Sequence, residues 1–236
     1  MDISDIKVSS AVMHAPWNAY RASLVNVLRK KIANLKVIED TNREGVWQTA
    51  KRSWLSAFNT NSTHHLVVQD DIEVCNGFMA DLPHVISALP DKPIYLFTTR
   101  NSVLEAAQNK DSHWVRQYGA LSGCGVILPK WMIKEWFEWL PTVIPDDWEP
   151  NVDDSRLALF LLSRKESAWI TIPTLVEHLG ASSSEIGHNN ARRVSCNYLG
   201  SRRPREIDWT KGAKDAPTAG SGMSYEGYLK KCKLST

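Results

Sequence analysis

The segment HLVVQDD at residues 65–71 constrains the fold more than any other part of the chain. It is a nearly continuous run of apolar, β-branched residues that ends abruptly in two acids. Runs of this kind are typical of strands that are buried on both faces of a parallel sheet. Ligand sites in such sheets lie at the carboxyl ends of the strands. The segment therefore predicts a buried strand that carries Asp70 and Asp71 into a ligand site.

Strand-like and helix-like segments alternate from residue 6 to residue 175. Alternating or continuous apolar runs predict strands, and apolar residues at three- and four-residue steps predict amphipathic helices. The alternation predicts one α/β domain with a mostly parallel central sheet and helices on both faces. The expected strands are 6–13, 35–40, 65–71, 93–99, 123–129 and 169–173, and the expected helices are 17–33, 44–58, 76–89, 100–109, 131–140 and 153–163.

Composition argues against several other classes of protein. The 236 residues are 43% apolar and 23% charged, which is typical of a globular protein and not of a disordered or coiled-coil chain. No apolar run approaches the ~20 residues of a membrane span. We also expect no signal peptide, and the four cysteines lie too far apart for a zinc knuckle or a disulfide framework. These features predict a soluble cytoplasmic protein of unknown oligomeric state.

Charge is unevenly distributed along the chain. Residues 188–236 contain ten Lys/Arg and four Asp/Glu, a balance of 10 − 4 = +6, so the net charge of +2 leaves 2 − 6 = −4 for residues 1–187. An acidic body with a basic tail suggests contacts with metal and with a polyanion, although a solvated basic terminus explains the charge equally well. We expect a main domain over 1–187 and a basic segment over 188–236, with a flexible stretch at 216–224.

The acids at the end of the predicted strand suit a hard divalent cation. Asp70 and Asp71 point to opposite sides of the chain, and Glu73 shares the side of Asp71. Such a cation is commonly held by one or two carboxylates together with substrate phosphates. A simple turn after the strand is the alternative, because Asp is also a favourable turn residue.

Several segments taken together resemble a GT-A-fold glycosyltransferase. In that family a DxD-like motif at the end of a central strand holds Mg²⁺ or Mn²⁺ on the diphosphate of a nucleotide-sugar. The combination is similar to small glycosyltransferases of bacteriophages and bacteria, some of which glycosylate hydroxymethylated DNA bases. The resemblance covers residues 6–195 and is carried by QDD after a Trp-rich helix, GCGVILP at 123–129, VDDSRL at 152–157, PTLVEHLG at 173–180 and SSSEIGH at 182–188.

The resemblance implies a metal site and a UDP-sugar as the expected donor. Gln69 occupies the first DxD position, so metal coordination would fall to Asp71, with Asp70 beside the ribose or in contact with the metal's ligands. His178 would be the second protein ligand, and His188 competes for that role. The chain is short and leaves little room for a separate acceptor domain. If a phage encodes it, the host cytoplasm is its expected location.

The acceptor hydroxyl must lose its proton as it attacks the sugar, which requires a base. Inverting members of the family place the base at a helix start, so Asp154 is the expected base, with Asp153 as a cap or acceptor contact. A helix cap and a first-turn acid would explain both residues without catalysis. If the enzyme retains stereochemistry, the assignment fails.

The remaining donor contacts are expected at the end of the first strand and at a glycine pair. The family's first-strand loop meets the nucleotide base, and glycines let the backbone approach a sugar closely, although they also suit a tight turn. Arg21 can reach the phosphates, but a solvated helix face is the preferred interpretation. The expected donor-binding residues are His14, Ala15, Pro16, Asp70, Gly123 and Gly125.

Arginines in the basic segment are candidates for contacts with the phosphates of double-stranded DNA that carries modified pyrimidines. They can instead bind the donor diphosphate. Three other functions stay open: transfer to a surface glycan, non-catalytic nucleic-acid binding, and a metal-dependent phosphotransferase or nuclease that uses Asp70, Asp71 and Glu73. The candidate DNA-binding residues are Arg192, Arg193, Arg202, Arg203 and Arg205.

Overall fold

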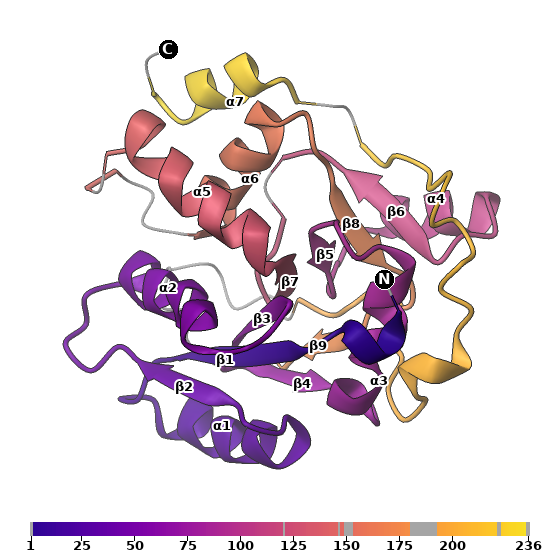
Figure 1. Cartoon of the computed structure of the whole chain (residues 1–236), viewed down its shortest axis with the longest axis horizontal. Helices are drawn as coiled ribbons and strands as arrows, with labels where there is room; N and C mark the ends of the chain where they lie inside the picture. Colours follow the sequence, from indigo (N-terminus) through magenta and orange to yellow (C-terminus); the bar gives the residue numbers. More distant parts are fainter. Residues whose placement is uncertain are drawn as a thin grey trace.

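The computed structural model describes residues 2–119, 121–145, 147–148, 153–179, 193–220 and 223–234 (Figure 1). Within these ranges the central sheet contains seven strands, and a second sheet contains two. The central strands are β1 (Val8–His14), β2 (Lys36–Glu39), β3 (His64–Gln69), β5 (Ile94–Tyr95), β6 (Trp114–Gln117), β7 (Gly125–Pro129) and β8 (Ala168–Thr171); the small sheet pairs β4 (Ile72–Val74) with β9 (Val176–His178).

Helices connect most of these strands. The α-helices are α1 (Ala19–Lys31), α2 (Val46–Leu55), α3 (Phe78–Ala88), α4 (Asn101–Asn109), α5 (Lys130–Val143), α6 (Asp153–Ser163) and α7 (Tyr225–Lys231). Short 3₁₀ turns lie at Ile3–Asp5, Ser56–Asn59 and Pro204–Glu206.

The strand order of the central sheet is β2-β1-β3-β7-β5-β8-β6. The pairs β1–β2, β1–β3 and β5–β8 are parallel, whereas β7 is antiparallel to both of its neighbours and β6 is antiparallel to β8. Five strands therefore run in one direction and two in the other. The predicted α/β class and mostly parallel sheet are confirmed. The carboxyl ends of β1, β3, β5 and β8 lie along one edge, where β7 begins.

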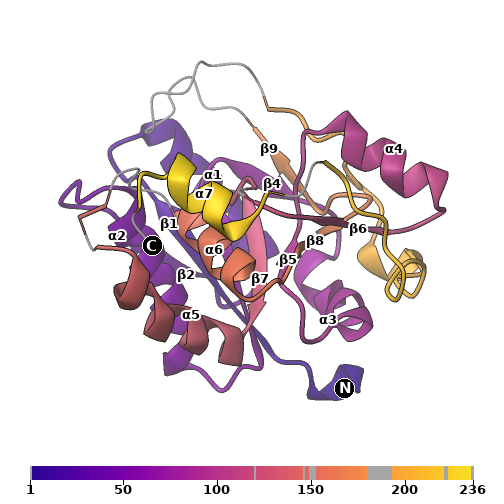
Figure 2. The same ribbon diagram turned by 90° about the horizontal axis from the view of Figure 1, so that it is seen from above.

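Both faces of the sheet are buried, as the continuous apolar strands predicted. Alternate residues of β3 serve two cores: Val67 faces α2, α5 and α6, while Leu66 and Val68 face α1 and α3. The two views show the same two layers of helices, with α7 lying against α6 (Figures 1 and 2). The sheet thereby holds the ends of its strands rigidly.

Some elements differ from the prediction. The strand expected over 93–99 is a ladder strand only at β5. Beyond it, the amide of Leu96 donates to the carbonyl of Gly125, and its carbonyl accepts from the amides of Leu175 and Val176. The short strands β4, β6 and β9 were not predicted, since runs of three or four residues carry little periodicity. On α1 the buried side is Arg21, Val25 and Leu28, whereas Tyr20 and Val27 are 47% and 46% exposed.

The described part of the basic segment packs onto the main body. Leu199 and Trp209 belong to the core beside α1 and α3, and the Trp114 indole nitrogen donates to the carbonyl of Trp209 at 2.8 Å. Residues 216–220, expected to be flexible, follow the edge of β6, where the amide of Arg116 donates to the carbonyl of Pro217. No helix in the described ranges is long and apolar enough to cross a membrane.

Candidate active site

Asp70 lies directly after β3 and is held on three sides. Its side chain is buried, at 1% exposure. One carboxylate oxygen lies 2.9 Å from His14 Nδ1 and accepts from the amide of Ala15 at 2.8 Å, and the other lies 2.5 Å from Arg21 Nη1. Two of the expected donor-binding residues, His14 and Ala15, are therefore brought together with Asp70. These contacts fasten the loop after β1 to the end of β3.

Asp71 has one engaged oxygen and one that lacks a partner. Oδ2 lies 2.8 Å from Arg21 Nη2 and 3.4 Å from His178 Nε2. Oδ1 is buried and has no hydrogen-bond partner among the described residues. Burial alone would raise the pKa of Asp71, but the hydrogen bond with His178 and the charge of Arg21 outweigh burial and lower it. Asp71 is therefore an ionised carboxylate with one buried oxygen that has no partner in the described chain.

Arg21 is the residue of this site that the sequence analysis placed wrongly. It is 8% exposed and bridges Asp70 and Asp71 instead of lying on a solvated helix face. A planar guanidinium suits two neighbouring carboxylates because its donors form a rigid fork. The signal was present in the sequence, since Arg21 continues the spacing of Val25 and Leu28. An arginine on a buried stripe needs carboxylate partners, and the acidic strand end supplies them.

Asp153 and Asp154 form a second acid pair at the start of α6, and the electrostatics of this pair differ. Asp153 is buried, and its Oδ2 accepts from Trp54 Nε1 at 3.3 Å. Burial raises the pKa of Asp153 despite this hydrogen bond. Burial and the neighbouring charge of Asp153 raise the pKa of Asp154 to about 7, which the positive charge of Arg193 opposes. Asp154 is therefore poised to exchange a proton near neutral pH.

The start of α6 is held by aromatic side chains. Arg156, one turn after Asp153, lies between two indole rings, with its Cζ 4.5 Å from the Trp47 centroid and 4.8 Å from that of Trp148. Its Nη2 also donates to the carbonyl of Trp148. From the C-terminal helix α7, the Tyr228 hydroxyl lies 3.5 Å from Ser155 Oγ. Sequence reasoning missed these supports because they join α6 to α2 and α7, which are far from it in the sequence, and to the segment that precedes it.

The backbone before β7 connects the two acid pairs. A side chain at Gly123 would lie 3.8 Å from Asp153 Oδ1 and 3.9 Å from Gln69 Nε2. Cys124 Sγ lies 3.6 Å from Gln69 Oε1. Burial, with smaller contributions from the charges of Asp71 and Asp154, raises the pKa of Cys124 to about 12, so both acids act on one thiol. Gly123 therefore lies between Asp153 of the second pair and Gln69, the residue that precedes the first pair.

Two other expected residues do not face this space. Gly125 packs against the small sheet, since a Cβ there would lie 3.1 Å from Val176 Cγ2. Glu73 points into a different pocket, and β4 pairs it with Glu177. Among the residues that the structure describes, no three His, Cys, Asp or Glu side chains gather as a metal cluster. The three-acid centre of Asp70, Asp71 and Glu73, expected for a nuclease, is not formed.

The loop after β1 presents an exposed aromatic ring. Trp17 follows the half-buried Pro16 and is 36% exposed, and the Arg43 guanidinium lies 5.1 Å from its ring centroid. By contrast, Trp114 and Trp148 are buried. Trp17 is thus the exposed tryptophan next to the contacts of Asp70.

The basic residues are divided between structural and exposed roles. Arg203 and Arg205 both bind Asp81 of α3, whose side chain is fully buried, with Arg203 Nε 2.9 Å and Arg205 Nε 2.7 Å from its oxygens. Gly77, at φ +64°, leaves room for this contact, since a Cβ there would collide with the Arg203 guanidinium. Arg202 pairs with Glu206 and is largely exposed.

Other predicted residues are either exposed or outside the described chain. Arg193 is exposed on the side of Asp154. Arg192, His188 and the SSSEIGH motif lie outside the described residues. A scan against protein-family models found no match for this chain, and a search of curated proteins found none either.

Proposed function

We propose that the protein is a metal-dependent glycosyltransferase that moves a sugar from a nucleotide-sugar to a hydroxyl acceptor. This proposal rests on two acid pairs at one edge of the sheet, Asp70–Asp71 and Asp153–Asp154. The pKa of Asp71 is lowered and that of Asp154 is raised. Gly123 lies near Asp153 and Gln69. Sugar transfer needs positive charge on the leaving diphosphate and a base on the acceptor. The first pair can hold a cation for the diphosphate, and the second pair can supply the base.

The first pair fits a divalent cation. Asp71 Oδ1 is a buried carboxylate oxygen without a partner in the described chain, and His178 Nε2 lies 3.4 Å from Oδ2 of the same carboxylate. We propose that Asp71 and His178 hold Mn²⁺ or Mg²⁺, which would offset the negative charge of the donor diphosphate. Arg21 and His14 fix Asp70, which keeps the strand end and the β1 loop in register.

The second pair fits a general base. A carboxyl group with a pKa near 7 is ionised in part of the molecules at neutral pH and can accept a proton without a large energetic cost. We assign the base to Asp154 and the orientation of the acceptor to Asp153, whose position Trp54 and Arg156 maintain. This assignment favours inversion of stereochemistry at the sugar.

The β1 loop supports binding of the nucleotide base. Trp17 offers an exposed ring next to His14, Ala15 and Pro16, and Arg43 covers part of that ring. A base can stack on such a ring regardless of its hydrogen-bonding edge. We therefore keep the assignment of this loop to the donor nucleotide, with a UDP-sugar as the first donor to test.

We further propose that the acceptor is a hydroxymethylated base in duplex DNA, with a surface glycan as the alternative. Arg203 and Arg205 neutralise buried Asp81, so the exposed Arg193 and Arg202 are the better candidates for phosphate contacts. Replacing both by Ala should reduce the log–log salt slope of duplex binding by about two. A duplex affinity that does not depend on salt would direct the search to glycans.

The experiment that tests the activity is hydrolysis of a panel of nucleotide-sugars with and without Mn²⁺. Wild-type protein should release nucleoside diphosphate only with the metal, and Asp71→Ala should lose both this release and Mn²⁺-dependent donor binding. Asp111→Ala is the matched control, because Asp111 is an exposed acid paired with Lys211 far along the sheet edge. Metal-independent release, or wild-type turnover by Asp71→Ala, would reject the proposal.

A further inference from the structure

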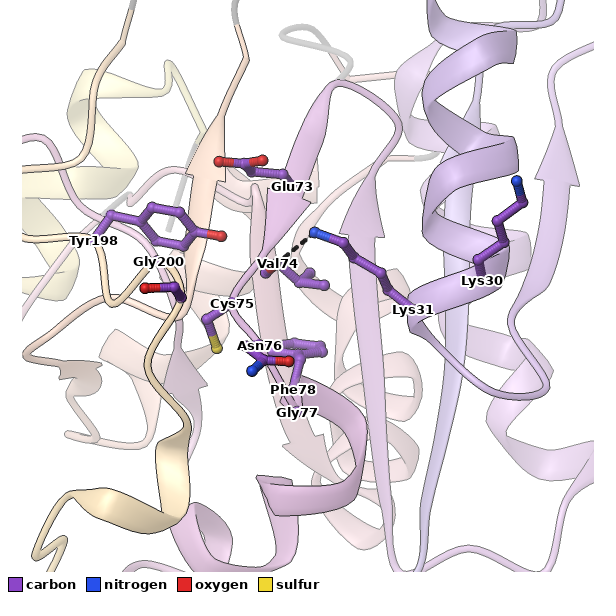
Figure 3. A pocket seen from close by; sticks show the side chains of 11 residues that line it. Lys30, Lys31, Glu73, Val74, Cys75, Asn76, Gly77, Phe78, Tyr198 and Gly200 are labelled. Carbon is purple, nitrogen blue, oxygen red and sulfur yellow. Dashed lines mark hydrogen bonds between the residues drawn. The ribbon is translucent and has the colours of Figure 1, made fainter.

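A second pocket lies at the opposite end of α1 from the candidate active site. Its volume is about 510 Å³, and it lies between the last turn of α1, the end of β4, the start of α3 and residues 198–201 (Figure 3). Arg21 contacts the first acid pair and Lys31 lines the pocket. Lys31 lies ten residues after Arg21, which corresponds to about 15 Å along the helix axis. The cationic side of the pocket is therefore distinct from the acid pairs, while Glu73 on its other side lies two residues after Asp71.

One wall of the pocket is cationic. Lys30 and Lys31 line it from the last turn of α1, and Figure 3 shows the Lys31 ammonium reaching over toward β4. Lys31 Nζ donates to the carbonyl of Val74 at 3.3 Å, which fixes the position of the charge. An ammonium has three donors, so one bond to the backbone leaves two for a ligand. Lysine is a common ligand for phosphate groups.

The other side of the pocket carries hydrogen-bonding groups and one negative charge. Figure 3 shows the Tyr198 hydroxyl opposite Lys31, with Glu73 and Asn76 lining the space as well. Burial, and then the charge of Glu73, raise the pKa of Tyr198, so its hydroxyl stays protonated and can donate.

The pairing of Glu73 makes it a favourable acceptor for a ligand. β4 and β9 place Glu73 directly opposite Glu177, and like charges in that position are destabilising. One oxygen of Glu177 accepts from the backbone amides of His178 and Ser195. Hydroxyl groups of a ligand could donate hydrogen bonds to Glu73 and offset its repulsion with Glu177. A bare anion filling the pocket would increase this cost.

We propose that this pocket binds a phosphorylated sugar, with the phosphate against the Lys31 ammonium and the sugar hydroxyls against Glu73, Asn76 and Tyr198 (Figure 3). The cationic wall favours the phosphate, and the acidic wall requires hydroxyl groups on the rest of the ligand. The site lies beyond the proposed transferase activity and does not depend on it. Its link to Asp71 is the short strand β4, which begins one residue after that acid.

The test is calorimetric titration of the full chain with glucose 6-phosphate at low salt, compared with inorganic phosphate and with glucose. Wild-type protein should bind glucose 6-phosphate more tightly than either fragment. Lys31→Ala should weaken this binding by about tenfold or more, as expected for loss of a hydrogen bond to a charged group. Arg29→Ala is the matched control, because it removes a cation from the same exposed helix end without lining the pocket.

Two further variants distinguish a phosphorylated-sugar site from a plain phosphate site and from the first acid pair. Glu73→Gln should reduce the preference for glucose 6-phosphate over inorganic phosphate, while Asp71→Ala should leave the binding unchanged. Absence of saturable binding, equal losses in Lys31→Ala and Arg29→Ala, or equal affinities for phosphate and glucose 6-phosphate would overturn the proposal. Loss of binding in Asp71→Ala would place the ligand at the first acid pair and would also overturn it.

Discussion

The two acid pairs contain the same residues in the same order, yet the fold gives them opposite properties. Asp70 and Asp71 follow a strand and share one buried guanidinium, and the hydrogen bond with His178 together with the charge of Arg21 lowers the pKa of Asp71. Asp153 and Asp154 begin a helix, where burial and then the neighbouring charge of Asp153 raise the pKa of Asp154 to about 7. Arg156 is near this second pair, but its guanidinium lies between two indole rings.

This difference teaches that the position of a cation, more than the identity of the acids, decides what each pair can do. An ionised carboxylate suits a metal, and a carboxyl group that titrates near neutrality suits proton transfer. Sites that divide roles in this way separate the pKa values of like residues by environment. The two pairs can therefore be tested against each other, one cation or one carboxylate at a time.

The largest effect is expected from Arg21→Ala, which should destabilise the protein by about 3–5 kcal/mol at pH 7. The variant leaves two buried carboxylates without their shared cation, and removing one partner of a buried ion pair costs this much. Because the pKa of Asp71 is lowered in the folded protein, the stabilisation is present above the ordinary carboxyl range and lost as pH falls below it. Urea unfolding across pH checks both statements.

The control for this prediction is Arg52→Ala, which breaks an exposed ion pair with Glu44. Exposed pairs contribute little, so the loss of stability should be clearly smaller than for Arg21→Ala. Equal losses in the two variants would show that burial of Arg21 does not matter to the first pair.

The second largest effect is expected from Asp154→Asn, which should reduce transfer by about 10²-fold or more while donor affinity is kept. Losses of this size are usual when a general base is removed. Transfer by the wild-type protein should rise with pH and reach half its maximum near pH 7, because the base must be ionised. Initial rates and donor titrations from pH 5 to pH 9 measure both; unchanged transfer would move the base elsewhere.

The same variant should stabilise the protein at pH 8. A carboxyl group whose pKa is raised by folding binds protons more tightly in the folded state, so its ionisation costs stability as pH rises from about 4 to about 7. Asparagine removes that cost, and a gain between about 1 and 4 kcal/mol is expected above pH 7. Thermal unfolding at pH 5 and pH 8 distinguishes this gain from a pH-independent packing effect.

The contrast also shows what could be predicted from the sequence. The strand HLVVQDD is strongly apolar and continuous, so its burial and its acidic end were predicted correctly, as were the helices around it. The strands β4, β6 and β9 were missed because their pairing is fixed by distant segments and not by local periodicity. The packing of residues 193–220 against the main body was missed for the same reason, because it also depends on contacts with distant segments.

Within the candidate site, the polar residues were found more easily than their partners. The acids and His178 stand out at the ends of apolar runs, but the roles of Arg21, Trp54 and Arg156 follow from contacts over 49 to 109 positions of sequence. The pKa difference between the pairs was not predictable for this reason. Arg203 and Arg205 were assigned to an external partner because they belong to a basic run. In the structure both bind Asp81 of the same chain.

A smaller effect is expected from Asp153→Asn. Removal of this negative charge should lower the pKa of Asp154 and move the acidic limb of the transfer profile below pH 7. The amide oxygen can still accept from Trp54 Nε1, so the start of α6 should keep its place. The pH dependence of kcat, measured with saturating donor, reports the shift. A loss of transfer at every pH without a shift would indicate that Asp153 positions the acceptor.

The smallest effect is expected from Arg193→Ala, and it separates electrostatics at the second pair from binding of a polyanion. The charge of Arg193 lowers the pKa of Asp154, so its removal should move the acidic limb above pH 7. Because Arg193 is exposed, the shift should disappear at about 1 M salt, where screening acts over roughly 3 Å. Arg202→Ala is the matched control: both variants should weaken duplex DNA binding, but Arg202 pairs with Glu206 and should leave the pH profile unchanged. A profile that moves equally in both variants would mean that net charge, and not the place of Arg193, sets the pKa of the base.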